Sequence, residues 1–242
     1  MEKVNFWNKL HIYRDKIIVS CLLVLTFSIS GIAQIKHKPI NLANYDDRKL
    51  HYGFTLGLNS TRYNLIHSDF YVREDTVTSA LAPRSVGFSL GFILNYKLAD
   101  YFALRMLPTV SFYERKVAYK LNDGSKVNQI TESTFIEIPL LAQYKSQRRK
   151  NLRFYLTAGL KAGIEAGAKK KEKKPSELRT QNFDLSFDYG IGMDVFYPFF
   201  KFSPEIRFSH GLLNMLNNDP NVYARSLNRV TSHTVSLFLH FE

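Results

Sequence analysis

Three carboxylates share one face of an alternating stretch, residues 183–195. Asp184, Asp188 and Asp194 stand at even positions with serine and glycine, whereas the odd positions carry bulky apolar side chains. Paired carboxylates are the groups that general acid–base catalysis uses. In an extended strand, however, Asp188 and Asp194 lie about 20 Å apart. The stretch therefore favours a strand with two different faces over a paired catalytic site.

The rest of the sequence offers no stronger catalytic or metal-binding pattern. None of the seven histidines stands at ligand spacing from another histidine or from Cys21, the single cysteine. There is no G-x-S-x-G motif, and the glycine pair at 190 and 192 is followed by no helix that would make a phosphate loop. We expect no catalytic residue, no cofactor and no metal.

Period-2 patterns recur along the chain and predict eight strands. They cover residues 51–59, 86–97, 102–113, 135–144, 153–163, 183–196, 200–210 and 232–242. Pro108, Pro139 and Pro204 fall inside three of these strands. Because proline cannot donate to the ladder, bulges or early strand ends are expected near each of them.

Strand length and loop length both indicate a membrane barrel. The predicted strands are long enough to cross a bilayer, which takes about 9–11 tilted residues. Short connections follow the second, fourth and sixth strands, and long ones follow the others, at residues 63–84, 114–133, 164–182 and 211–231. This alternation is typical of short periplasmic turns and long external loops. The predicted fold is all-β: a closed eight-stranded antiparallel transmembrane β-barrel, residues 51–242.

The polar face of the strands is predicted to line the lumen. A soluble lipocalin-like barrel would alternate in the same way, but its outer face would be rich in charge. Here that face is glycine-rich with few charges of mixed sign, and tyrosines gather at strand ends, at positions 96, 101, 144, 155 and 197. Buried charges need partners, so a structural lumen network is predicted. Its members are Arg105, Glu137, Asp188, Asp194, Glu205 and Arg207. Asp184 is expected to be solvated near the external end.

The N-terminus reads as an export signal. Basic residues precede an apolar run that ends in small residues, which predicts a signal peptide over residues 1–33 with cleavage after Ala33. A lipoprotein site at Cys21 is the weaker alternative, because only four residues separate it from Lys16. Residues 34–50 show no periodicity and are interpreted as an extended periplasmic leader.

One charge run lies in the third long loop. It is predicted to be external, and it contains Lys169, Lys170, Lys171, Lys173 and Lys174. The run is either a solvated loop or a contact for an acidic partner or anionic surface lipid. Nucleic acid is not an expected partner of an exported barrel, although the chain has a net charge of +12. Outer-membrane lipid is an expected partner.

Several segments resemble PorT-type outer-membrane barrels. The more specific ones are the leader with its Asn-Tyr-Asp-Asp segment, residues 41–59, and the pattern Glu205-x-Arg207-x-Ser209-His210-Gly211. Similar stretches lie at 95–105, 135–144, 155–163 and 190–212. The resemblance implies a non-enzymatic accessory component of the type IX protein secretion system, linked to gliding motility, with other secretion proteins as partners. The alternative is a small barrel that binds a ligand, surface lipid or adhesion partner through its external loops.

Overall fold

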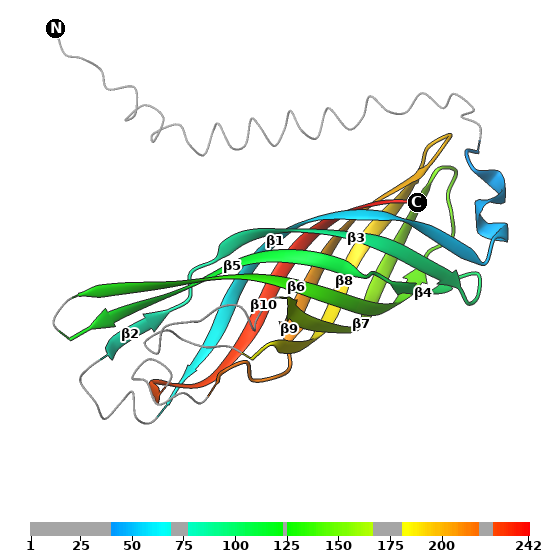
Figure 1. Cartoon of the computed structure of the whole chain (residues 1–242). Helices are drawn as coiled ribbons and strands as arrows, with labels where there is room; N and C mark the ends of the chain where they lie inside the picture. Colours follow the sequence, from blue (N-terminus) through cyan, green and yellow to red (C-terminus); the bar gives the residue numbers. More distant parts are fainter. Residues whose placement is uncertain (1–39, 69–76, 123–124, 167–180, 218–224) are drawn as a thin grey trace, which may run out of the picture. The chain divides into compact units, whose positions relative to one another are not determined.

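Antiparallel strands form a closed ring in the computed structural model, which describes residues 40–68, 77–122, 125–166, 181–217 and 225–242 (Figure 1). The strands are β1 (Leu50–His67), β2 (Val77–Leu81), β3 (Ser85–Lys97), β4 (Phe102–Met106), β5 (Thr109–Leu121), β6 (Lys126–Lys145), β7 (Leu152–Ala166), β8 (Phe183–Phe196), β9 (Lys201–Gly211) and β10 (Leu227–Phe241). A short 3-10 helix, η2 (Ala43–Asp47), precedes β1. No helix within the described ranges is long and apolar enough to cross a membrane.

The ring has eight places, as the sequence predicted. β1 pairs with β10 on one side and with β3 on the other, which closes the sheet. β4 and β5 follow one another in a single strand position between β3 and β6, so they count as one strand of the ring. β2 pairs only with the outer part of β5. Closure satisfies the backbone hydrogen bonds that an open edge would leave unpaired in lipid. The eight-stranded transmembrane barrel is therefore confirmed.

Each of the three strand prolines lies at an irregularity of the ladder, as expected. The predicted third strand breaks at Pro108 into β4 and β5. Pro139 faces that break, where its carbonyl accepts a hydrogen bond from the Leu107 backbone N–H at 3.1 Å. At Pro204 the pairing of β8 with β9 is interrupted between Gly192↔Glu205 and Val195↔Phe202. The missing N–H groups thus fall where no ladder bond is made.

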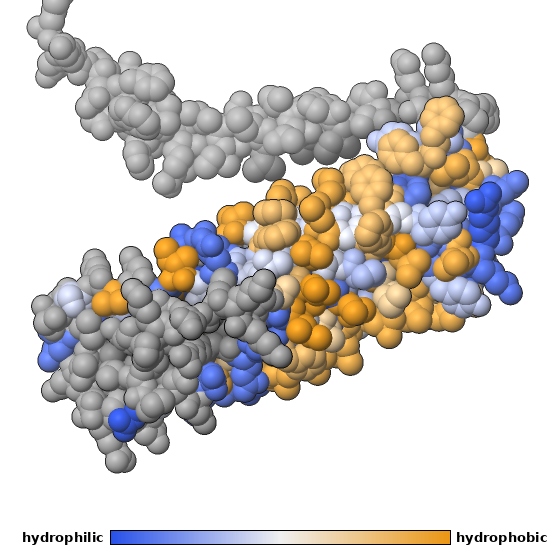
Figure 2. Space-filling model, in the orientation of Figure 1, coloured by the Kyte–Doolittle hydropathy of each residue, from blue (hydrophilic) through white to orange (hydrophobic). Residues whose placement is uncertain are grey.

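The two faces of the wall differ as the alternation predicted. Along β8 the odd residues from 187 to 193 are exposed, while Asp184, Asp188 and Asp194 point inward and are buried. Figure 2 shows the apolar belt on the visible face of the barrel, with hydrophilic surface at the periplasmic end. Two expectations were wrong. Tyr155 belongs to the lumen rather than to the interfacial tyrosines, and Asp184 is buried and accepts a 2.6 Å hydrogen bond from Ser232.

Beyond the membrane the strands continue, so the long loop predicted for residues 114–133 was wrong. β5 and β6 pair from Thr109↔Glu137 out to Lys120↔Lys126. There the polarity of the wall reverses: Val117 and Tyr119 are buried inside, whereas Glu114 and Lys116 form an ion pair outside. The external end of the lumen is filled by an apolar cluster, which includes Tyr63, Tyr113, Phe135, Met215 and Val230.

A close approach of neighbouring strands explains one lumen glycine. A Cβ atom at Gly159 on β7 would collide with the backbone carbonyl of Leu140 on β6. At Gly163, four residues further along the same face, an added Cβ would lie 3.4 Å from the nearest atom of Phe135, an ordinary contact. Only the first position therefore requires glycine for packing.

Candidate functional site

The leader folds back onto the periplasmic end of the barrel. It was expected to be extended, but residues 43–47 form the 3-10 helix η2. The turn into η2 passes through Leu42, whose φ of 47° is in the left-handed region that costs a residue with a Cβ about 1 kcal/mol or more. The Arg148 guanidinium donates hydrogen bonds to the carbonyls of Asn41 and Leu42, which holds this turn in place.

Asp46 is the main ionic contact between η2 and the barrel. Its Oδ1 lies 2.8 Å from Nη1 of Arg153 on β7, and its Oδ2 lies 3.9 Å from Nη1 of Arg148. The Asp46 carbonyl also accepts a 2.9 Å hydrogen bond from Lys97. Burial favours a raised pKa for the Asp46 carboxyl, but Arg153 and then Arg148 outweigh it and hold the pKa below its usual range.

Tyr45 inserts beside the rim of the lumen. Its hydroxyl donates a 2.8 Å hydrogen bond to Oε2 of Glu242, and its ring stacks on His51 with centroids 4.0 Å apart. The Lys201 ammonium lies 4.8 Å from the same ring. Burial and the Glu242 charge raise the pKa of Tyr45, so the phenol stays protonated and remains a donor.

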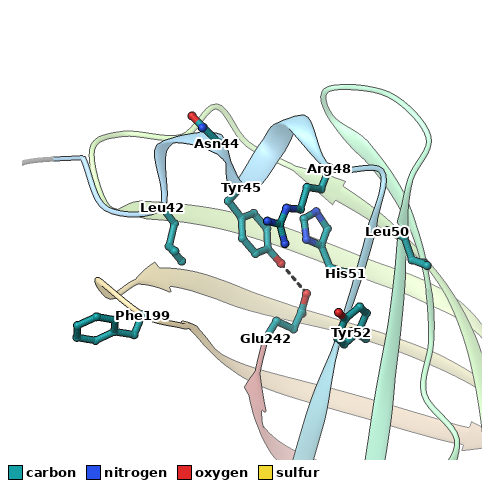
Figure 3. A pocket seen from close by; sticks show the side chains of 9 residues that line it. All are labelled: Leu42, Asn44, Tyr45, Arg48, Leu50, His51, Tyr52, Phe199 and Glu242. Carbon is teal, nitrogen blue, oxygen red and sulfur yellow. Dashed lines mark hydrogen bonds between the residues drawn. The ribbon is translucent and has the colours of Figure 1, made fainter.

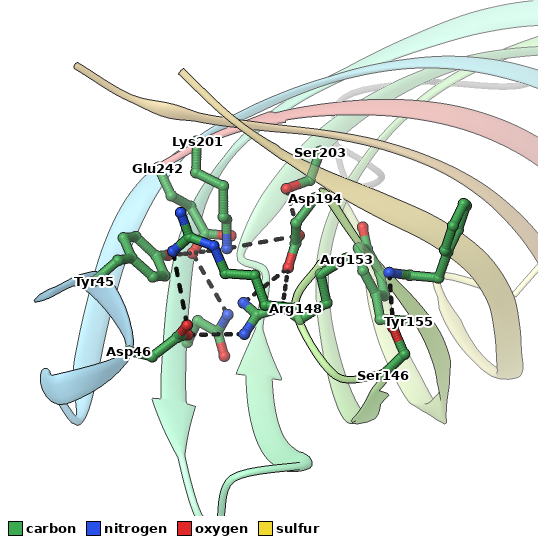
Figure 4. Close-up of polar contacts among 12 residues, drawn as sticks. Tyr45, Asp46, Ser146, Arg148, Arg153, Tyr155, Asp194, Lys201, Ser203 and Glu242 are labelled. Carbon is green, nitrogen blue, oxygen red and sulfur yellow. Dashed lines mark hydrogen bonds and ion pairs between the residues drawn. The ribbon is translucent and has the colours of Figure 1, made fainter. Parts of the chain in front are cut away.

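A chain of alternating charges runs from the leader into the lumen (Figure 4). Nε of Arg153 donates a 3.0 Å hydrogen bond to Asp194, whose other oxygen accepts one of 2.7 Å from Ser203. Lys201 lies 3.8 Å from Asp194 and 2.9 Å from Glu242. Burial would raise the pKa of Glu242, but Lys201 and Arg105 hold it well below the usual range. The leader is thus tied into the interior of the barrel.

The predicted lumen residues fall into two groups. In the middle of the lumen, the Glu205 carboxylate forms ion pairs with Arg207 at 2.6 Å and with Arg105 at 3.4 Å. It also accepts a 3.0 Å hydrogen bond from the Tyr155 hydroxyl. Arg105 also reaches Glu242 at 2.8 Å, so it joins this group to the periplasmic charges that include Asp194.

The second group lies nearer the external end. Glu137 pairs with Lys161 at 3.1 Å and accepts hydrogen bonds from Ser111 at 2.7 Å and from the Tyr113 hydroxyl at 3.1 Å. Asp188 is fully buried within the electrostatic reach of Lys161 and Arg207. Every predicted network residue therefore lies in the lumen, but Glu137 and Asp188 are placed apart from Asp194.

Sequence reasoning missed the residues that hold the leader: Tyr45, Asp46, Arg148, Arg153, Lys201 and Glu242. A signal existed for two of them. Along their strands, Arg153 lies on the same face as Lys161, and Lys201 lies on the same face as Glu205. The alternation of the sequence therefore already indicated that both side chains point inward. The predicted contact Lys169, Lys170, Lys171, Lys173 and Lys174 lies outside the described residues, as does the signal peptide.

A pocket of about 340 Å³ opens where the leader meets β1 (Figure 3). Its lining combines the leader residues Leu42, Asn44, Tyr45 and Arg48 with Leu50, His51, Tyr52, Phe199 and Glu242. Phe199 is 94% exposed, and the Arg48 side chain has no hydrogen bond or ion pair within the described part of the chain. The pocket therefore offers an apolar wall and an available cation side by side.

Metal chemistry finds no support among the described residues, which contain no group of three His, Cys, Asp or Glu side chains able to hold an ion. Comparison with known families gives one match, over residues 32–217, to the outer membrane protein beta-barrel domain. The chain belongs to this family. Its place in the outer membrane follows from that match and from the closed barrel. No curated protein matches the chain.

Three solved outer-membrane barrels are similar at low identity. OprG from Pseudomonas aeruginosa is 14% identical with a TM-score of 0.45, covering 80% of this chain and 95% of its own. The protein AlkL, solved in lipid bilayers, is 13% identical with a TM-score of 0.44, covering 86% and 93%. Ail, the attachment invasion locus protein of Yersinia pestis, is 13% identical with a TM-score of 0.36, covering 80% and 98%. The family assignment rests on the match over residues 32–217.

Proposed function

We propose that this barrel is a non-enzymatic accessory component of the type IX protein secretion system, linked to gliding motility, and that it acts through its periplasmic face. The sequence resemblance to PorT-type barrels supports this role. One of the segments that carries the resemblance is the leader, with Asn44, Tyr45 and Asp46. In the structure this segment is docked on the barrel rather than free.

The main support for the proposal is that the leader is docked on the barrel. Tyr45 and Asp46 turn toward the barrel, whereas Ala43, Asn44 and Asp47 are exposed to the periplasm. A segment fixed by half-buried ion pairs and by the Tyr45 hydrogen bond presents its outer side in one conformation, which lowers the entropy lost when a partner binds. The adjoining pocket adds Phe199 and Arg48 to the same surface. We infer that a periplasmic or outer-membrane secretion protein binds here.

A structural role for the buried acids supports the absence of catalysis. Asp194 is held by Arg153 and Lys201, and Glu205 is held by Arg207. Both carboxylates are also fully buried in the lumen, so a substrate has no access to them. Side chains fill an eight-stranded barrel, and the buried lumen of this one follows that rule. The proposed action is therefore through surfaces rather than through transport or chemistry.

A chromosomal replacement series tests the proposal. In a deletion strain, cargo proteins of the secretion system should accumulate in the periplasm. A strain with Asn44→Arg and Asp47→Arg should show the same defect while the barrel still reaches the outer membrane at wild-type level. Gln181→Arg with Asn182→Arg is the matched control, since both residues are exposed directly before β8 at the external end of the barrel, away from the leader. Normal delivery of cargo in the deletion strain would refute the secretion role.

The alternative role is contact through the external loops, carried by the lysine run of the third loop. Five lysines within six positions would attract an acidic partner or anionic lipid. Replacement of Lys169, Lys170, Lys171, Lys173 and Lys174 by serine should then abolish surface binding while leaving secretion intact. The opposite pattern, intact binding with the serine variant, removes this alternative.

A further inference from the structure

A row of basic side chains crosses the outer wall on four neighbouring strands. Arg62 on β1 is paired with His233 on β10, and His233 is paired with His210 on β9. Arg84 comes directly before Ser85, the residue of β3 that pairs with Thr61, so it extends the row on the other side of Arg62. Neighbouring strands are about 4.8 Å apart, so the four side chains span roughly 14 Å.

The row marks the outer boundary of the apolar belt. On β1 the outward residues from Arg62 toward the periplasm are Ser60, which is partly buried, and then Leu58, Leu56 and Phe54, which are all exposed. On β10 and β9 the outward neighbours of the two histidines are Val235 and Phe208. In Figure 2, patches of hydrophilic surface border the belt toward the external end of the barrel. Side chains at this level face the headgroups of the outer leaflet rather than its acyl chains.

Within the described residues, no acidic side chain pairs with the two arginines of this wall. β1, β3 and β10 contain no acidic residue, and the single acid of β9, Glu205, is buried in the lumen. Arg62 and Arg84 are exposed, with no ion pair or hydrogen bond within the described ranges. On the next strand, β5, the exposed acid Glu114 is already paired with Lys116 at 2.6 Å.

The histidines of the row are held in place by neighbouring rings. Nε2 of His210 lies 3.1 Å from the Tyr189 hydroxyl, and the two rings stack with centroids 5.5 Å apart. His233 meets His210 edge-on at 4.3 Å. The imidazoles therefore form a polar surface held by ring contacts beside the two exposed guanidinium groups, which suits a ligand with several oxygen atoms.

We propose that this row binds the phosphate groups of an anionic outer-leaflet lipid. Each arginine offers a planar set of donors that matches a phosphate, and such charge-assisted bonds are about twice as strong as neutral ones. The apolar wall below, with Leu58, Val235 and Phe208, receives the acyl chains of the same molecule. The site belongs to a different end of the barrel from the proposed secretion surface and does not depend on it.

Lipid retention tests the site. The full chain is purified in detergent, mixed with diphosphorylated lipid A or with the same lipid lacking its phosphates, and examined by native mass spectrometry. The wild type should retain the phosphorylated lipid preferentially. The double variant Arg62→Gln, Arg84→Gln should lower that retention by about tenfold, the effect expected for lost charge-assisted bonds. Arg62→Lys with Arg84→Lys keeps the charge but lacks the planar donor set, so it should restore part of the retention.

The matched control removes equal charge elsewhere. Lys49→Gln with Lys120→Gln changes two exposed cations, one in the leader and one on the outer part of β5, and should retain lipid as the wild type does. Heat-modifiable gel migration verifies that every variant is a folded barrel. Equal retention by the arginine and control variants, or binding of an acidic protein without retention of phosphorylated lipid, overturns the proposal.

Discussion

Nη1 of Arg153 lies 2.8 Å from Oδ1 of Asp46, which joins the wall of the barrel to the leader across 107 positions of sequence. Arg153 is buried, and the same guanidinium also holds Asp194 inside the lumen. One arginine therefore couples a surface segment to the interior charge network. The stability of the leader and that of the barrel end are linked through it.

Loss of the Asp46 carboxylate should loosen the leader without unfolding the barrel. Asp46 is half-buried, so its pair with Arg153 contributes about 1 kcal/mol. Asp46→Asn should raise the rate of tryptic cleavage after Arg48 and Lys49 about fivefold, because cleavage follows the open population. Asp47→Asn, at the exposed neighbouring carboxylate, is the control. Equal cleavage of the two variants would show that the ion pair does not hold η2.

Leader docking should weaken in acid. The pKa of Asp46 is lowered in the folded state, so its contribution is complete above the ordinary aspartate pKa of about 4 and is lost as the pH falls through the lower folded pKa. Amide hydrogen exchange of residues 43–48, corrected for the intrinsic rate, should show this loss. In the Asp46→Asn variant, the part of this pH dependence that comes from Asp46 should be absent, whereas any part that comes from Glu242 should remain. An identical pH profile in the variant would contradict the assignment.

Removal of Asp194 should destabilise the barrel itself. Asp194→Leu removes one of the two carboxylate partners of Arg153 and of Lys201, which keep Asp46 and Glu242. Complete loss of a buried partner costs about 3–5 kcal/mol, so this partial loss should cost less than that. The transition of heat-modifiable migration should move to lower temperature, and urea unfolding to lower concentration. Asp100→Leu, a change at an exposed turn carboxylate, should leave both unchanged. A wild-type transition for Asp194→Leu would show that the network does not support the fold.

Two glycines on one strand should respond differently to the same change. Gly159→Ala drives a methyl group into the Leu140 carbonyl and should separate β6 from β7, which lowers the yield of heat-modifiable barrel. Gly163→Ala meets only ordinary contacts and should assemble normally. Similar yields for both variants would indicate that the strands can shift apart at no cost.

The membrane part of the fold was predictable because lipid imposes a simple pattern. In β8 every outward residue from Phe187 to Met193 is apolar, and the predicted bounds, 183–196, match the strand. Beyond the bilayer the pattern reverses, with Tyr119 inside and Lys116 outside, since an apolar cluster fills the lumen and water surrounds the wall. An alternation rule that expects apolar side chains on the outer face therefore failed to predict the parts of β5 and β6 beyond the bilayer.

The candidate site was less predictable, because contacts distant in sequence create it. The 3-10 turn of the leader exists through Arg148 and Arg153, which lie over 100 positions away. No local sequence pattern predicts such a turn, and the left-handed conformation of Leu42 is one that leucine rarely adopts. The inward parity of Arg153 was readable from the sequence, but its partner in the leader was not.

The leader's binding site has a consequence for the order of assembly. It is composed of Arg148 from the connection between β6 and β7, Arg153 from β7, and Glu242 beside β10. These groups come together only when β10 has paired with β1 and the seam is shut. Arg148 and Arg153 belong to neighbouring parts of the wall, but the Tyr45 contact with Glu242 requires the end of β10 beside β1. Full occupancy of this site by the leader therefore requires a closed barrel.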